Sequence, residues 1–146
     1  MSLAVIAAPV RFEEIEIGRV FCTSETFEYP AMNQFAALSG DHSAIHADQK
    51  TARKFGFPDR LQYGFLLASL LSRIVGENFE HAVCAAVSMD FVKATIAGDR
   101  IDVRAEVAHV QQALRSVALK FTMLREGDVV ARGKLTTVFL PECEAA

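Results

Sequence analysis

Three side chains able to donate, accept or transfer a proton lie close together in the sequence: Asp41, Ser43 and His46. In a regular helix, positions five apart lie roughly 140° apart around the axis, because each residue turns the chain by about 100°. Asp41 and His46 can therefore face a common point only where the backbone is irregular. Ser39 and Gly40, just before Asp41, favour such a turn. A carboxylate and an imidazole held in this way could share general acid and base chemistry.

Gly64 is a second candidate, through its backbone N–H rather than a side chain. It precedes the apolar run from Phe65 to Val75, for which we expect a helix. Glycine allows a ligand to approach closely, and the start of a helix carries a partial positive charge. An N–H in this position could stabilise a developing oxyanion. Tyr63, the preceding residue, could contact a ligand with its phenol.

Together these residues resemble the signature of the MaoC-like hydratases and dehydratases of the hotdog superfamily. The residues that match are Phe35, Leu38, Ser39, Gly40, Asp41, Ile45, His46 and Gly64. Three positions depart: Ser43 stands where the family usually has Asn, Ala44 where it has Pro, and Tyr63 where it has His. The resemblance extends more loosely from about residue 12 to residue 140.

The resemblance implies a reaction in fatty acid metabolism. Members add or remove water across the C2–C3 bond of an acyl thioester, converting enoyl-CoA or enoyl-ACP to the 3-hydroxyacyl compound. It assigns catalysis to Asp41 and His46 without deciding which takes the proton of water. It assigns oxyanion or substrate binding to Gly64, Ser43 and Tyr63. No metal ion or other cofactor is needed for this chemistry.

Two alternatives keep the same fold. The departures at Ser43, Ala44 and Tyr63 fit a catalytically silent protein that binds acyl-CoA. Hotdog thioesterases use an acid near the start of the central helix, so hydrolysis of an acyl-CoA thioester is the other alternative. Release of free thiol would identify the thioesterase, and binding without turnover would identify the silent protein.

Length and composition limit the class of protein. The 146 residues are enough for one domain, expected to span 1–146 with its core at about 12–140, and 51% of them are hydrophobic. A net charge of −3 gives no basic face for nucleic acid or an anionic membrane. Scattered basic residues, Arg60 and Lys93 among them, are interpreted as solvated surface rather than as ligands of coenzyme A phosphates. The three cysteines lack metal-type spacing, so reduced thiols in the cytoplasm are expected.

The remaining elements follow from periodicity and turn residues. We expect a first strand at 21–27, a helix at 31–38, and a short helix from an Asp48 cap to Phe55. The central helix should end at Gly76, and its run of apolar residues is too short and too polar to span a membrane. Alternating apolar residues then predict four strands, with turns at 97–99, 111–112 and 126–128. Their inward residues are expected at 83, 85, 87, 89 and 91, at 101, 103, 105 and 107, at 117, 119, 121 and 123, and at 129, 131, 135 and 139.

These elements predict an α+β fold: a single hotdog domain with a curved antiparallel sheet wrapped around an apolar helix. A helix that is apolar on almost every side must be covered. Such a sheet leaves long edges unpaired, and hotdog proteins join two sheets edge to edge, so a homodimer or larger homo-oligomer is expected.

Overall fold

Five antiparallel strands form one sheet in the order β1-β3-β4-β5-β2 in the computed structural model, which describes residues 8–143. The first and last parts of the predicted domain, residues 1–7 and 144–146, lie outside the described residues. The strands are β1 (Val20–Thr26), β2 (Ala82–Phe91), β3 (Arg100–Gln111), β4 (Ser116–Arg125) and β5 (Asp128–Phe139).

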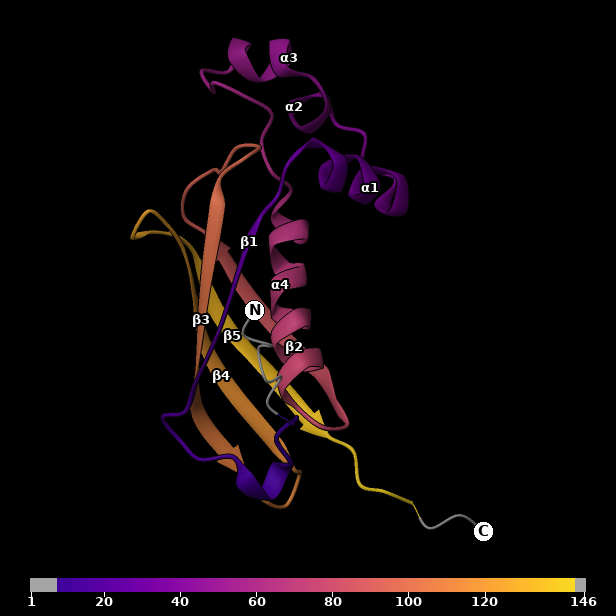
Figure 1. Cartoon of the computed structure of the whole chain (residues 1–146), viewed down its shortest axis with the longest axis vertical. Coiled ribbons are helices and arrows are strands. Elements are labelled where there is room, and N and C mark those ends of the chain that lie inside the picture. Colours follow the sequence, from indigo (N-terminus) through magenta and orange to yellow (C-terminus); the bar gives the residue numbers. More distant parts are fainter. Residues whose placement is uncertain (1–7, 144–146) are drawn as a thin grey trace, which may run out of the picture.

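Helix α4 (Gly64–Asn78) packs on one face of this sheet (Figure 1). Its buried residues are Leu66, Leu67, Leu70, Leu71, Ile74 and Val75. The predicted inward residues of β3 and β4 are all buried opposite them: 101, 103, 105 and 107, and 117, 119, 121 and 123. The prediction of one antiparallel sheet around one apolar helix is confirmed. The hydrophobic effect mainly holds the helix on the sheet, since these side chains leave water together.

The predicted end of the central helix at Gly76 is wrong. Helix α4 continues to Asn78, whose side-chain amide donates to the carbonyl of Ile74 at 2.8 Å. Phe79 follows as a buried anchor with 4% exposure. Gly76 lies on the exposed side of the helix. The low helix propensity of glycine destabilises this turn less than the Asn78 hydrogen bond and the burial of Phe79 stabilise it.

Strand β2 does not bury the alternating residues predicted for it. Val83, Val87 and Phe91 are 45%, 54% and 53% exposed, because β2 is the last strand of the sheet. Phe65 at the start of α4 is 79% exposed. Within a single chain, the central helix is therefore covered only on the side that faces the sheet.

Strand β5 also departs slightly from its predicted pattern. Val130, rather than Val129, is buried beside Ala131. The β4–β5 register shifts between Met123 and Leu124, which changes the side of the sheet to which residues beyond the shift point. The turn predicted at 111–112 lies later, because β3 runs to Gln111.

Three short helices gather at the end of the sheet where α4 begins (Figure 1). They are α1 (Tyr29–Ser39), α2 (Ala44–Ala47) and α3 (Gln49–Lys54), and a 3-10 turn (Phe12–Glu14) precedes β1. Asp48 caps α3 as predicted, accepting from the backbone N–H groups of Lys50 and Thr51. The backbone between Asp41 and His46, predicted to be irregular, consists of a turn followed by α2, which is a single helical turn.

Candidate active site

Asp41 follows the left-handed turn that ends α1. Gly40 has a φ of 77°, a conformation that glycine adopts without strain, and its N–H donates to the carbonyl of Ala36. The carboxylate oxygen Oδ1 of Asp41 accepts from the N–H of Ser43 at 3.1 Å and from its hydroxyl at 2.5 Å. The Ser43 hydroxyl is the main reason why the pKa of Asp41 lies below its usual range, followed by the Ser43 N–H. Asp41 is therefore held as a carboxylate.

His46 lies in α2, with its Nδ1 atom 2.8 Å from the backbone carbonyl of Leu61. A carbonyl only accepts hydrogen bonds, so Nδ1 must carry the proton in this contact. In the neutral ring, Nε2 is then unprotonated. His46 can therefore accept a proton at Nε2.

Tyr63 contacts both of these residues. Its ring stacks on that of His46, with centroids 4.1 Å apart and planes at 25°. Its hydroxyl donates to the backbone carbonyl of Asp41 at 2.8 Å. Burial, and secondarily the nearby Asp41 carboxylate, raises the pKa of Tyr63, which keeps the phenol as a donor. Tyr63 is only 2% exposed, so most of its surface contacts other parts of the protein. Its predicted contact with substrate stays a prediction.

Gly64 is the first residue of α4, and its N–H has no acceptor among the described residues. A Cβ atom built at this position would lie 2.7 Å from Cε1 and Cζ of Phe91. The absence of a side chain therefore lets the ring of Phe91, the last residue of β2, lie close to the start of the helix. This N–H is the kind of group that could stabilise a negative oxygen.

A pocket of about 430 Å³ brings these groups together. It is lined by Asp41, His46, Gln62, Tyr63, Gly64, Phe65, Leu67, Phe91, Val92, Lys93, Ala94 and Thr95. Four of the five predicted site residues are in this set. Ser43 is not, and it acts on the Asp41 carboxylate instead.

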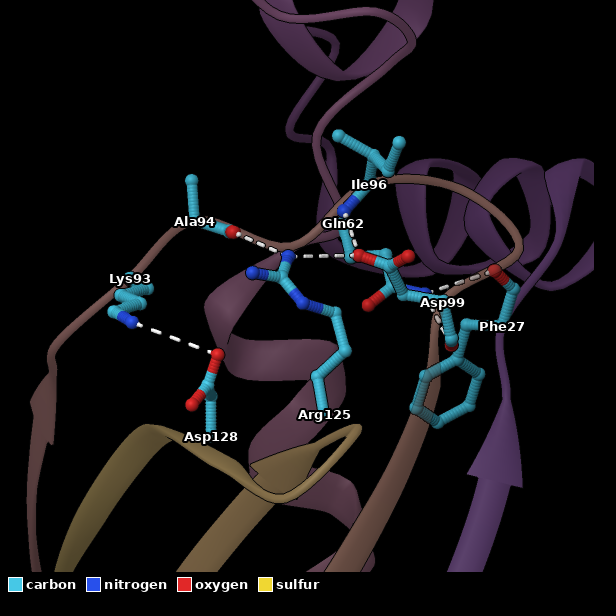
Figure 2. Close-up of polar contacts among 8 residues, drawn as sticks. All are labelled: Phe27, Gln62, Lys93, Ala94, Ile96, Asp99, Arg125 and Asp128. Carbon is cyan, nitrogen blue, oxygen red and sulfur yellow. Dashed lines mark hydrogen bonds and ion pairs between the residues drawn. The ribbon is translucent and has the colours of Figure 1, made fainter.

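The segment after β2 forms one wall of the pocket and is fixed by polar contacts (Figure 2). Arg125 Nη1 donates to the carbonyl of Ala94 at 3.1 Å and to Asp99 Oδ2 at 3.0 Å. The same carboxylate oxygen accepts from the N–H of Ile96 at 2.9 Å. Lys93 is half exposed and lies 3.9 Å from Asp128, a long ion pair that leaves it largely solvated, as predicted.

Gln62 is a pocket residue that sequence analysis missed. Figure 2 shows its side chain beside Phe27 and Asp99, whose backbone carbonyls accept from Nε2 at 3.0 and 3.2 Å. Its Oε1 atom is buried and has no partner among the described residues. Phe27 is 35 residues away in the sequence, so no local pattern marks Gln62.

Comparison with known proteins identifies the family of this chain. A model of the MaoC like domain matches residues 11–125. The chain belongs to this family. The family prediction made from the sequence motif is thus confirmed.

Two curated relatives place this MaoC-like chain among named lyases. A mitochondrial 3-hydroxyacyl-[acyl-carrier-protein] dehydratase of Arabidopsis thaliana is 28% identical over 108 residues, which are 74% of this chain and 65% of that protein. This chain thus spans slightly less than two thirds of that relative. An (R)-specific enoyl-CoA hydratase of Aeromonas caviae is 26% identical over 131 residues, which are 88% of this chain and 98% of the hydratase. Both relatives carry names from the hydratase and dehydratase class predicted from the sequence motif.

A solved structure shows the same fold. The (R)-hydratase from A. caviae superposes on this MaoC-like chain with a TM-score of 0.84 at 24% identity, covering 88% of this chain and 99% of the hydratase. The predicted hotdog fold is confirmed. Over the described part of the chain, no helix is both long and apolar enough to cross a membrane, and no cluster of three potential metal ligands is present.

Proposed function

We propose that this chain catalyses the addition of water to the C2–C3 double bond of an enoyl thioester, or the reverse dehydration. The observation that carries the proposal is the meeting of Asp41, His46 and the start of α4 around one pocket. A carboxylate, a neutral imidazole and an unpaired N–H are the groups that this reaction requires.

In the hydration direction, the water lies between Nε2 of His46 and the second carboxylate oxygen of Asp41. His46 takes a proton as the water oxygen bonds to C3, and the π electrons move towards the thioester oxygen. The N–H of Gly64 stabilises that oxygen as it gains negative charge. The enolate then re-forms the carbonyl, and His46 returns the proton to C2. Dehydration follows the same steps in reverse.

Hydration of crotonyl-CoA tests this proposal, because the absorbance of the conjugated thioester is lost on water addition. We expect His46→Gln to lower kcat by about 10²–10⁴, the usual contribution of a positioned acid or base. Asp41→Asn should lower kcat by about 10²-fold, because the water loses the carboxylate that orients it. His42→Gln is the matched control, since His42 is exposed and outside the pocket. Variants of Asp41 and His46 that both match the wild type would refute the assigned roles.

The same assay separates the two alternatives. Release of free coenzyme A without loss of the double bond would indicate a thioesterase. Thermal stabilisation by acyl-CoA of several chain lengths, without any turnover, would indicate a silent binder. Either outcome would replace the hydratase proposal.

We also propose a homodimer in which the sheet edges at β2 meet. Its support is the exposed apolar surface along β2 together with Phe65 on α4. Residues 1–146 would act as one MaoC-like domain in each copy. The three cysteines of the chain are free, which supports a reducing cytoplasmic location.

A further inference from the structure

Arg60 is a buried cation that the proposed reaction does not use. It is 7% exposed, so the expectation that it is solvated surface is wrong. Among the described residues, no carboxylate lies within ion-pair distance of its guanidinium. Burying a charge is costly unless its donors are satisfied. The contacts of Arg60 therefore need a specific explanation.

The guanidinium group joins α1 to the turn that carries the imidazole. Its Nε atom donates to the backbone carbonyl of His46 at 2.5 Å, and Nη2 donates to Asn33 Oδ1 at 2.8 Å. Its central carbon lies 4.3 Å from the ring centroid of Tyr29, which gives the cation a favourable π face. Of these three contacts of the guanidinium, only the one with His46 is to a backbone group.

Leu61 forms two further hydrogen bonds with the turn that carries His46. Its N–H donates to the carbonyl of Ile45 at 3.1 Å, and its carbonyl accepts from Nδ1 of His46 at 2.8 Å. Residues 60 and 61 thus hold residues 45 and 46 by three hydrogen bonds. On their other side, the N–H of Ala97 donates to the carbonyl of Arg60 at 2.8 Å, which ties the pair to the segment between β2 and β3.

We propose that Arg60 is a positioning residue for His46. By holding the carbonyl of His46, it fixes the turn so that Nδ1 meets Leu61 and Nε2 is left free for the pocket. Its effect on catalysis rests on the proposed function, whereas its effect on the imidazole does not. The planar guanidinium suits this task because it presents two donors in a fixed geometry, to His46 and to Asn33, while its face packs on Tyr29.

Nitrogen NMR of His46 tests the positioning without any turnover. In the neutral wild-type ring, Nδ1 should resonate as a protonated nitrogen and Nε2 as an unprotonated one. Arg60→Met retains side-chain length and removes the donors. We expect its His46 signals to move towards an average of the two tautomers. Unchanged signals in a folded Arg60→Met variant would overturn the proposal, whatever the enzyme activity.

Kinetics then connect the positioning to the reaction. We expect Arg60→Met to lower kcat for crotonyl-CoA hydration by about 10- to 100-fold with KM changed less than threefold, since small misplacements of catalytic groups have effects of this order. Arg60→Lys should recover part of kcat and part of the tautomer signal, and it serves as the test variant if Arg60→Met does not fold.

Asn33→Ala is the matched control. Asn33 is exposed, and its loss leaves the bond between Arg60 and His46 in place. We expect its kcat and its His46 signals to remain close to those of the wild type. Equal losses in Asn33→Ala and Arg60→Met would show that Arg60 acts through the packing of α1, and the proposal would be wrong.

Discussion

Asp41 and Ser43 act as a unit. Both donors of Ser43 reach one carboxylate oxygen, which leaves Oδ2 without a hydrogen bond among the described residues. Ser43 thus holds the carboxylate, at a position where the family motif usually has asparagine. This departure from the motif therefore leaves the Asp41 carboxylate oriented.

The pH dependence of Ser43→Ala tests this role. The Ser43 hydroxyl lowers the pKa of Asp41, so the carboxylate stays ionised to lower pH than an ordinary aspartate. Removing the hydroxyl raises that pKa towards its usual value. We expect the pH midpoint of the Asp41 carboxyl carbon signal in NMR to move to higher pH in Ser43→Ala. Ser39→Ala is the control, because the Ser39 hydroxyl accepts from the Asp41 N–H and does not touch the carboxylate. An unmoved midpoint in Ser43→Ala would contradict this account.

Helix α4 contains two glycines whose surroundings differ. Gly64 faces the ring of Phe91, which leaves no space for a Cβ atom. Gly76 has no atom within 4 Å of a built Cβ. A Cβ atom at the first glycine would push the ring of Phe91 aside, whereas the second glycine only weakens the helix.

Gly76→Ala should stabilise the protein. Alanine has the higher helix propensity, and the exposed site gives its methyl group nothing to clash with. We expect the free energy of unfolding in urea to rise by about 0.5–1 kcal/mol. A lower urea midpoint would show that this turn of α4 is not an ordinary helix. Hydration activity should be unchanged, because Gly76 lies outside the pocket.

Gly64→Ala should lower activity through a displaced ring. The added methyl group would lie 2.7 Å from Phe91 and force that ring to move within the pocket wall. We expect kcat/KM for crotonyl-CoA to fall at least about tenfold, given the sensitivity of catalysis to small misplacements. The double variant with Phe91→Ala removes the clash and should recover activity relative to Gly64→Ala. Failure of that recovery, with Phe91→Ala itself active, would exclude the ring as the cause.

The sheet has two unpaired edges, β1 and β2, and the edge at β2 carries the larger apolar surface. Strand β2 exposes valine and phenylalanine side chains and a row of backbone groups that have no partner strand among the described residues. Edges of this kind are normally protected by charge, by short length or by pairing. Pairing with a second copy is the protection that this apolar surface favours.

Val87→Lys tests the pairing. Val87 is 54% exposed, so a lysine there should not disturb the fold of one chain. Across a dimer edge, the charge would oppose association. We expect light scattering to give the mass of two or more chains for the wild type and a smaller mass for Val87→Lys. Leu114→Lys is the control, since Leu114 is 61% exposed but lies in the turn between β3 and β4. A monomeric wild type would refute the proposed dimer.

Local signals in the sequence determined much of this protein. Alternation in β3 and β4, the Asp48 cap and the turn at Gly40 depend on residues a few positions apart, so their patterns are visible in the chain. The motif resemblance also singled out Asp41, His46 and Gly64, which line one pocket. Tertiary structure alone decided how they are held. Arg60 meets His46 across 14 positions, Tyr63 meets Asp41 across 22, and Gln62 meets Phe27 across 35. Such contacts depend on the paths of several elements in space, and no periodicity in the sequence records them.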